Sequence, residues 1–256
     1  MHIWCRLTTR PQPMASGWLE HSFRLGNDGR AVTVGVGFFV FPASFMMPGP
    51  VPAAITVTAF AILSALLLLG ATRFGALRPF GAANAVTTVR VGLLALLIGS
   101  VVDAAVTLTT WWPAALAGVA LALDGLDGAL ARRLGTESRF GALFDQETDA
   151  LLILVLTVAL ALAGKTGLWI VAAGLMRYLL LASGWIWPVL AEPLPKSRLR
   201  SGVCAVMVGA LVLCLLPPVA PATANVFGAI ALTALTLSFG KDLIWLLKSA
   251  RGRKHA

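Results

Sequence analysis

Histidine and cysteine are scarce in this chain of 256 residues, and their positions limit the chemistry available to it. All three histidines lie in the terminal tails, at His2, His21 and His255. A histidine base or metal ligand in the body of the protein is therefore not expected. Cys5 lies in a polar tail, whereas Cys204 and Cys214 share an apolar segment, so neither a disulfide framework nor a zinc-binding spacing is present. Acid–base chemistry consequently falls to carboxylates.

Carboxylates are also few, with eleven Asp and Glu against twenty Lys and Arg. Six of them gather in one stretch: Asp124, Asp127, Glu137, Asp145, Glu147 and Asp149. The chain as a whole is apolar, with 58% hydrophobic residues and a mean hydropathy of +0.86, so a soluble core is not expected. The net charge of +9 indicates no affinity for nucleic acid, because the basic residues fall in short loops between apolar runs.

These runs predict an all-α fold, a polytopic membrane helical bundle with a six-helix core and an N-terminal helical hairpin. Residues 1–30 form a polar tail without the apolar core of a signal peptide. The hairpin, residues 31–72, joins the apolar segments Ala31–Met47 and Val51–Ala71, and its lack of charge predicts that it is dispensable for chemistry. The six core spans are expected at Val91–Leu108, Trp112–Ala131, Ala142–Ala163, Leu168–Leu190, Gly202–Leu216 and Ala224–Leu247.

The positive-inside rule orients these spans in the cell membrane (the inner or plasma membrane). If the spans alternate, four basic clusters fall on one side, at residues 73–90, 132–139, 196–200 and 248–254. The opposite side holds Lys165 and the uncharged segment PPVAPAT. The acidic stretch and both termini are therefore expected to be cytoplasmic, and much of the net charge is expected to contact anionic lipid headgroups.

The acidic stretch reads as two antiparallel helices joined by the short turn RLGTESR. Residues three and four apart share a helical face, which gives one stripe on each helix. The first stripe holds Asp124, Asp127, Gly128 and Ala131, and the second holds Gly141, Asp145 and Asp149. We expect the stripes to face each other, with the small residues allowing close approach of the two helices.

Carboxylates inside a membrane need compensation, since each Asp costs roughly 2.5 to 3.5 kcal/mol on insertion. By sequence only Arg132, Arg133 and Arg139 lie near them. A divalent cation is the simplest compensation, and a set of oxygen ligands suits Mg²⁺ or Mn²⁺ better than zinc. A structural salt-bridge cluster or a buried proton relay is the alternative.

The pattern D-x2-D-G-x2-A-R-x8-G-x3-D-x3-D resembles the signature of the CDP-alcohol phosphotransferase family. Its fixed positions are Asp124, Asp127, Gly128, Ala131, Arg132, Gly141, Asp145 and Asp149. The resemblance implies a domain at residues 80–256 that moves a phosphatidyl or related phosphoalcohol group, in phospholipid biosynthesis. The donor would be CDP-linked, such as CDP-diacylglycerol, the acceptor a small alcohol or phospho-alcohol, and the product CMP. The family also implies a homodimer in contact with membrane lipid.

The resemblance implies roles for the residues of the pattern. Asp124, Asp127 and Asp145 would be the main metal ligands. Asp149 would add a ligand or act as the catalytic base that takes the acceptor proton. The remaining positions are assigned to substrate binding: Gly128, Ala131, Arg132 and Gly141. Glu147 points to roughly the opposite face of its helix and is not expected to bind metal.

Three further features are candidates for substrate binding. Asn84, Thr87 and Arg90 form N-x2-T-x2-R just before the first core span, which resembles a nucleotide-binding segment of the family; a helix cap is the alternative. Arg177, in the middle of a span, would bind a substrate phosphate, pair with a motif acid or snorkel. Arg198 in KSRLR would anchor the topology or bind a phosphate.

Two other functions use similar residues. A magnesium-dependent intramembrane prenyltransferase would need a second Asp-rich motif, but beyond residue 149 only Glu192 and Asp242 are acidic. A cation transporter would spread its acids over several helices at mid-membrane, whereas these acids cluster near one end.

Overall fold

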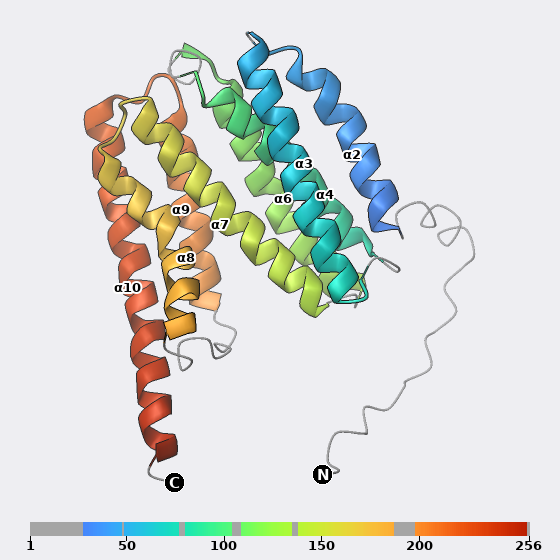
Figure 1. Cartoon of the computed structure of the whole chain (residues 1–256). Helices are drawn as coiled ribbons and strands as arrows, with labels where there is room; N and C mark the ends of the chain where they lie inside the picture. Colours follow the sequence, from blue (N-terminus) through green and yellow to red (C-terminus); the bar gives the residue numbers. More distant parts are fainter. Residues whose placement is uncertain are drawn as a thin grey trace.

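The computed structural model describes residues 28–47, 49–76, 80–103, 109–134, 138–186 and 198–254. Within these ranges the chain is helical and contains no strand, which confirms the all-α prediction. Figure 1 shows the helices, whose bounds are α2 Gly29–Ser44, α3 Pro50–Arg73, α4 Ala82–Ser100, α6 Trp112–Leu134, α7 Arg139–Leu162, α8 Val171–Ile186, α9 Arg198–Leu215 and α10 Pro221–Lys254. A short 3₁₀ turn, Leu168–Ile170, leads into α8.

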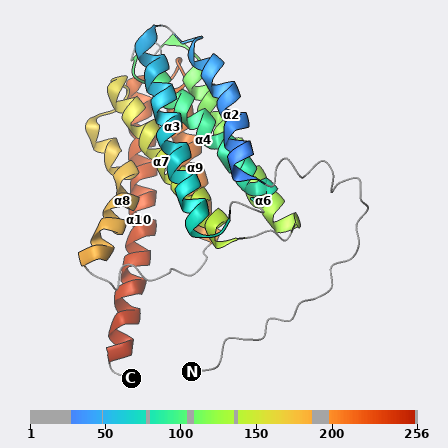
Figure 2. The same ribbon diagram turned by 45° about the vertical axis from the view of Figure 1, so that its right-hand side comes forward.

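The N-terminal hairpin consists of α2 and α3. The Asp28 side chain accepts a hydrogen bond of 3.0 Å from the backbone N–H of Arg30, which satisfies one free donor at the start of α2. Gly49 has a φ of 92° just before α3, a conformation that favours glycine, and Pro50 then starts the helix where a missing N–H costs nothing. Both helices pack along α4, as the two views show (Figures 1 and 2).

Two glycines let the hairpin approach α4 closely. A Cβ at Gly99 would stand 1.9 Å from Thr56 Oγ1 and 2.8 Å from the carbonyl oxygen of Pro52, both in α3. At Gly92 it would stand 2.7 Å from a methyl group of Val36 in α2. Side chains at these two positions would push the helices apart. The hairpin is therefore in intimate contact with the first helix of the core.

The opposite side of α4 faces the centre of the bundle, where α6, α7 and α9 meet. Fully buried side chains from these helices form one apolar cluster, including Leu94, Leu97, Ala117, Leu156, Leu160, Leu211 and Leu215. Thus α4 lies between the hairpin on one side and the core on the other.

Several helix boundaries differ from the sequence prediction, most of all in the first and the last core span. The first core span was expected from Val91, but α4 begins at Ala82 and ends at Ser100. Polar residues do not interrupt it, because their side chains bond to the preceding turn: Asn84 Nδ2 donates to the carbonyl oxygen of Phe80 (2.5 Å) and Thr88 Oγ1 to that of Asn84 (2.8 Å). At the other end of the chain, α10 continues to Lys254 and extends beyond the bundle (Figure 1).

The outer surface is that of an integral membrane protein. Three stretches within the described helices are long and apolar enough to cross a membrane: Pro50–Arg73, Ala82–Ser100 and Pro221–Lys241. Large apolar side chains also point outward from the hairpin, with Phe38 78% and Leu66 61% exposed. Exposed apolar area of this kind is costly in water and favourable against lipid tails.

Lys165 joins three helices at the end of the bundle far from the acidic stretch. Its side chain is 2% exposed, and Nζ donates to the backbone carbonyls of Cys214 (3.2 Å) and Leu216, at the C-terminus of α9. Its own carbonyl accepts a bond of 3.2 Å from Asn225 in α10. An ammonium group suits the negative end of a helix, although burial lowers the pKa of Lys165.

Candidate active site

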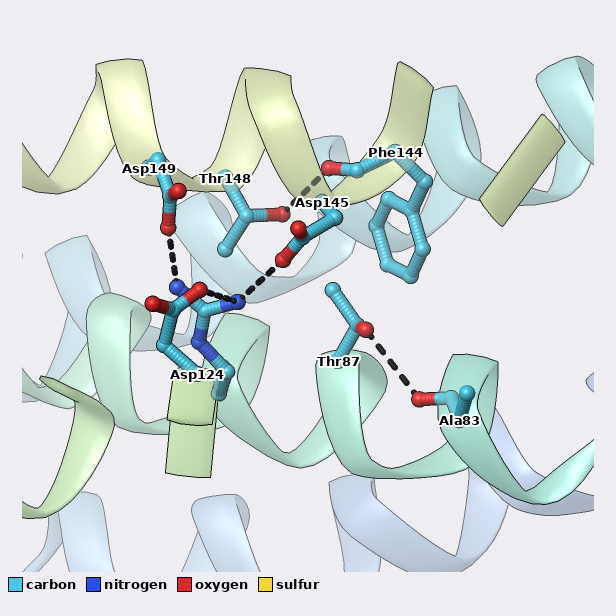
Figure 3. Close-up of polar contacts among 8 residues, drawn as sticks. Ala83, Thr87, Asp124, Phe144, Asp145, Thr148 and Asp149 are labelled. Atoms are coloured by element: carbon cyan, nitrogen blue, oxygen red, sulfur yellow. Dashed lines mark hydrogen bonds and ion pairs between the residues drawn. The ribbon is translucent and has the colours of Figure 1, made fainter. Parts of the chain in front are cut away.

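Helix α7 begins at a well-formed cap and presents two carboxylates on one face. Ser138 Oγ accepts a hydrogen bond of 2.9 Å from the backbone N–H of Gly141, which fixes the start of the helix. Asp145 and Asp149 follow one turn apart, so both side chains project in the same direction. Figure 3 shows them pointing from α7 toward Asp124 of α6.

The three carboxylates converge on one point. One oxygen from each of Asp124, Asp145 and Asp149 lies within 4.8 Å of the other two, and all three side chains are half-buried. Carboxylate oxygens at this spacing can share a hard divalent cation, and an all-oxygen set fits Mg²⁺ or Mn²⁺. The residues present therefore fit the metal that the sequence analysis expected.

Arg90 lies among these carboxylates, a position that was not predicted from the sequence. Its guanidinium Nη1 is 3.1 Å from Asp124 and 2.6 Å from Asp145, while Nη2 pairs with Asp149. The residue is 1% exposed and lies inside the bundle, whereas the sequence suggested only a basic position on one side of the membrane. The available signal was the apolar run VGLLALLIGS directly after it, which extends the helix and places Arg90 inside the bundle.

The polar face of α4 runs along the acidic face of α7. A Cβ on Gly141 would stand 2.7 Å from Asn84 Oδ1, and Arg90 meets the two carboxylates further along α7. Thr87, between them, donates to the carbonyl oxygen of Ala83 (3.1 Å; Figure 3). Asn84, Thr87 and Arg90 thus lie on the buried face of α4. The helix-cap alternative is excluded, because the N-cap of α4 is Gly81.

The carboxylates of the two acidic helices face each other as expected, but Gly141 does not serve the close approach of α7 to α6. Among the residues whose side chains the structure describes, α6 and α7 touch at few positions, whereas α4 packs against both. Gly141 makes room for Asn84 of α4 rather than for the backbone of α6. Helix α4 therefore supplies the wall against which the two carboxylate-bearing helices are placed.

Glu147 lies on another face of α7 and pairs with Arg177 of α8. Both Nε (3.3 Å) and Nη2 of Arg177 donate to the Glu147 carboxylate. Glu147 is not part of the carboxylate group around Arg90. Arg177 thus pairs with an acid of the same stretch that is not a fixed position of the motif.

Several candidate residues have side chains outside the part of the chain that the structure describes. These are Asp127, Gly128, Ala131, Arg132 and Arg198. The backbone of the first four continues α6 beyond Asp124, and Arg198 begins α9.

Comparison with known proteins agrees with the geometry of the site. A family model described as CDP-alcohol phosphatidyltransferase matches residues 80–239, which cover α4 to α9 and much of α10. No curated protein and no solved structure matches the chain.

Proposed function

The chain belongs to the CDP-alcohol phosphatidyltransferase family, a family of transferases for substituted phosphate groups, and on that premise we propose its donor and site. The donor is CDP-diacylglycerol, whose phosphatidyl group passes to the hydroxyl of a small alcohol or phospho-alcohol with release of CMP. The observation that carries this proposal is the convergence of Asp124, Asp145 and Asp149 on one point. The reaction belongs to phospholipid biosynthesis.

A divalent cation, Mg²⁺ or Mn²⁺, would be held by Asp124, Asp145 and Asp149, with Asp127 of α6 as a further ligand. Such an ion would supply positive charge to neutralise the leaving phosphate and to polarise the phosphorus under attack. The chain supplies the rigid frame for this chemistry: α6 and α7 fix the carboxylates, and α4 holds both helices. Such prior positioning lowers the entropic cost of bringing donor and acceptor together.

Asp149 is proposed to take the proton of the acceptor hydroxyl or to complete the ligand set. It lies one turn further along α7 than Asp145, away from the Ser138 end of the helix. The polar residues of α4, Asn84 and Thr87, lie toward that end and are proposed to bind the nucleotide part of the donor. The remaining substrate contacts are proposed at Gly128, Ala131, Arg132, Gly141, Arg177 and Arg198.

The site is proposed to open to the cytoplasm, with both termini on that side. Support comes from the basic loops, which the positive-inside rule places there. A lipid donor would then enter sideways from the membrane, and a water-soluble acceptor from the cytoplasm. Residues 80–256 are proposed as the catalytic domain, residues 31–72 as an added hairpin, and the working unit as a homodimer.

The proposal is tested by incubating the purified full chain with CDP-diacylglycerol, Mg²⁺ and single acceptors in parallel. The panel holds glycerol 3-phosphate, inositol phosphate, serine and choline, and the measurement is CMP release together with the lipid product. One acceptor should raise CMP release far above the rate without acceptor. If every acceptor leaves CMP release at the background rate while the protein is folded, CDP-diacylglycerol is not the donor.

A further inference from the structure

We infer that Arg90 is an internal competitor of the divalent cation: its guanidinium holds Asp124, Asp145 and Asp149 together in the metal-free chain and gives up at least one of them when metal binds. Arg90 is thereby a positioning residue that sets the metal affinity of the site. The inference rests on the proposed function, because it takes the three carboxylates to be the metal ligands. It concerns what holds the carboxylates before metal binds, which the proposed reaction leaves open.

The geometry places the guanidinium and the metal ligands at the same point. Nη1 contacts both Asp124 (3.1 Å) and Asp145 (2.6 Å), and Nη2 contacts Asp149. These are the residues whose oxygens come within 4.8 Å of one another. A carboxylate oxygen that accepts a short charge-assisted bond from Arg90 has given up much of its capacity to bind a cation. A divalent cation bound by the three carboxylates would also lie close to the positive charge of the Arg90 guanidinium, which repels it.

The backbone of Arg90 has little freedom to retreat. Gly92 and Gly99, on the other side of α4, pack directly on the hairpin, with Val36 and Thr56 at their α-carbons. Leu94 and Leu97, further along α4, are buried in the central core. Exchange between guanidinium and cation therefore requires rotation of the Arg90 side chain and not movement of α4.

The guanidinium of Arg90 has two opposite effects on the site. Three carboxylates brought together without compensation repel one another, and Arg90 offsets that repulsion before any metal is present. The same contacts must be broken in part when a cation binds, so they weaken metal affinity. Removing the guanidinium should therefore lower the stability of the metal-free protein and increase the affinity for metal.

The test compares Arg90→Gln with the wild-type full chain in detergent, with Mn²⁺ as the probe. Free Mn²⁺ is followed by electron paramagnetic resonance during titration, and thermal unfolding is measured in EDTA and at saturating Mn²⁺. We expect Arg90→Gln to bind Mn²⁺ about tenfold more tightly, within the usual range for coupled sites. It should unfold at a lower temperature than wild type in EDTA, and saturating Mn²⁺ should narrow the difference.

Arg139→Gln is the matched control, since it removes the same charge from the exposed start of α7. Its Mn²⁺ affinity should stay within about twofold of wild type, because exposed charges are screened. If Arg90→Gln binds Mn²⁺ as tightly as wild type or more weakly, Arg90 does not compete with the cation, and the proposed metal site is not contradicted. No Mn²⁺ binding by wild type overturns both the inference and the proposed metal site.

Should Arg90→Gln fail to fold, Arg90→Lys replaces it. One ammonium group cannot bridge three carboxylates, so Arg90→Lys should bind Mn²⁺ more tightly than wild type, by a smaller factor than expected for Arg90→Gln. An unchanged Mn²⁺ affinity of Arg90→Lys contradicts the inference.

Discussion

Asp124 and Asp149 contact the same guanidinium from different helices, yet their proposed roles differ. Asp149→Asn removes the group proposed as base, so turnover should fall about 10²-fold or more, the usual scale for losing general base catalysis. Asp124→Asn removes a charged ligand from α6 and should weaken donor binding more than Asp149→Asn does. The measurement is donor affinity beside turnover for both variants. If Asp149→Asn abolishes donor binding as fully as Asp124→Asn, Asp149 is principally a ligand.

Single residues also show what the sequence could predict. The face of α7 that carries Asp145 and Asp149 follows from helical periodicity, and so does the different orientation of Glu147. The partners of these side chains do not follow from it. Periodicity tells which residues share a face, but not which helix that face meets. The contacts of Arg90 with Asp124, 34 residues later, and with Asp145, 55 residues later, were therefore not predicted.

Among the helices, the hairpin packs more closely on the core than the sequence indicated, while its dispensability for chemistry stays a prediction. Its lack of charge predicted that it is dispensable, but its close packing on α4 argues that it holds the helix bearing Arg90. Gly99→Ala puts a Cβ 1.9 Å from Thr56 Oγ1 and 2.8 Å from the backbone oxygen of Pro52. Overpacking of this kind costs about 1–3 kcal/mol, so thermal unfolding should shift to lower temperature and CMP release should fall.

Gly35→Ala is the control for that substitution. A Cβ on Gly35, which is exposed on α2, meets no atom within 4 Å. Replacing glycine by alanine in an open helical position stabilises the helix by up to about 1 kcal/mol. Gly35→Ala should therefore keep or raise the unfolding temperature. Equal unfolding temperatures for the two variants would show that α3 and α4 are not in close contact.

The pairing of Arg177 with Glu147 joins α8 to α7 and gives a second prediction for the helices. A double-mutant cycle with Arg177→Gln and Glu147→Gln should give a coupling of about 0.5–1 kcal/mol in unfolding free energy. The small value follows from the 44% exposure of the Glu147 side chain. A coupling of zero would mean that the pair contributes nothing. If Arg177→Gln lowers the affinity for donor or acceptor both alone and in combination with Glu147→Gln, the phosphate-binding role of Arg177 is supported.

For the whole molecule, the sequence predicted which segments form helices better than it predicted which helices pack together. The hairpin and the six core segments all correspond to helices in the described residues, because apolar runs of this length have few other structures available in a membrane. The central position of α4 was not predictable in the same way. Its packing depends on Gly92, Gly99 and Asn84, whose partners Val36, Thr56 and Gly141 lie at distances along the chain that no local pattern encodes.

The central claim is that the carboxylates of α6 and α7 form a divalent-metal site that releases CMP from a CDP-linked lipid. The most direct measurement is CMP release by the purified chain with CDP-diacylglycerol and its acceptor, titrated with Mg²⁺ or Mn²⁺ after treatment with EDTA. Activity should be absent in EDTA and return with either ion. Asp145→Asn should need a much higher ion concentration, since it loses one charged ligand. Full CMP release in EDTA, or an unchanged ion requirement in Asp145→Asn, would contradict the account.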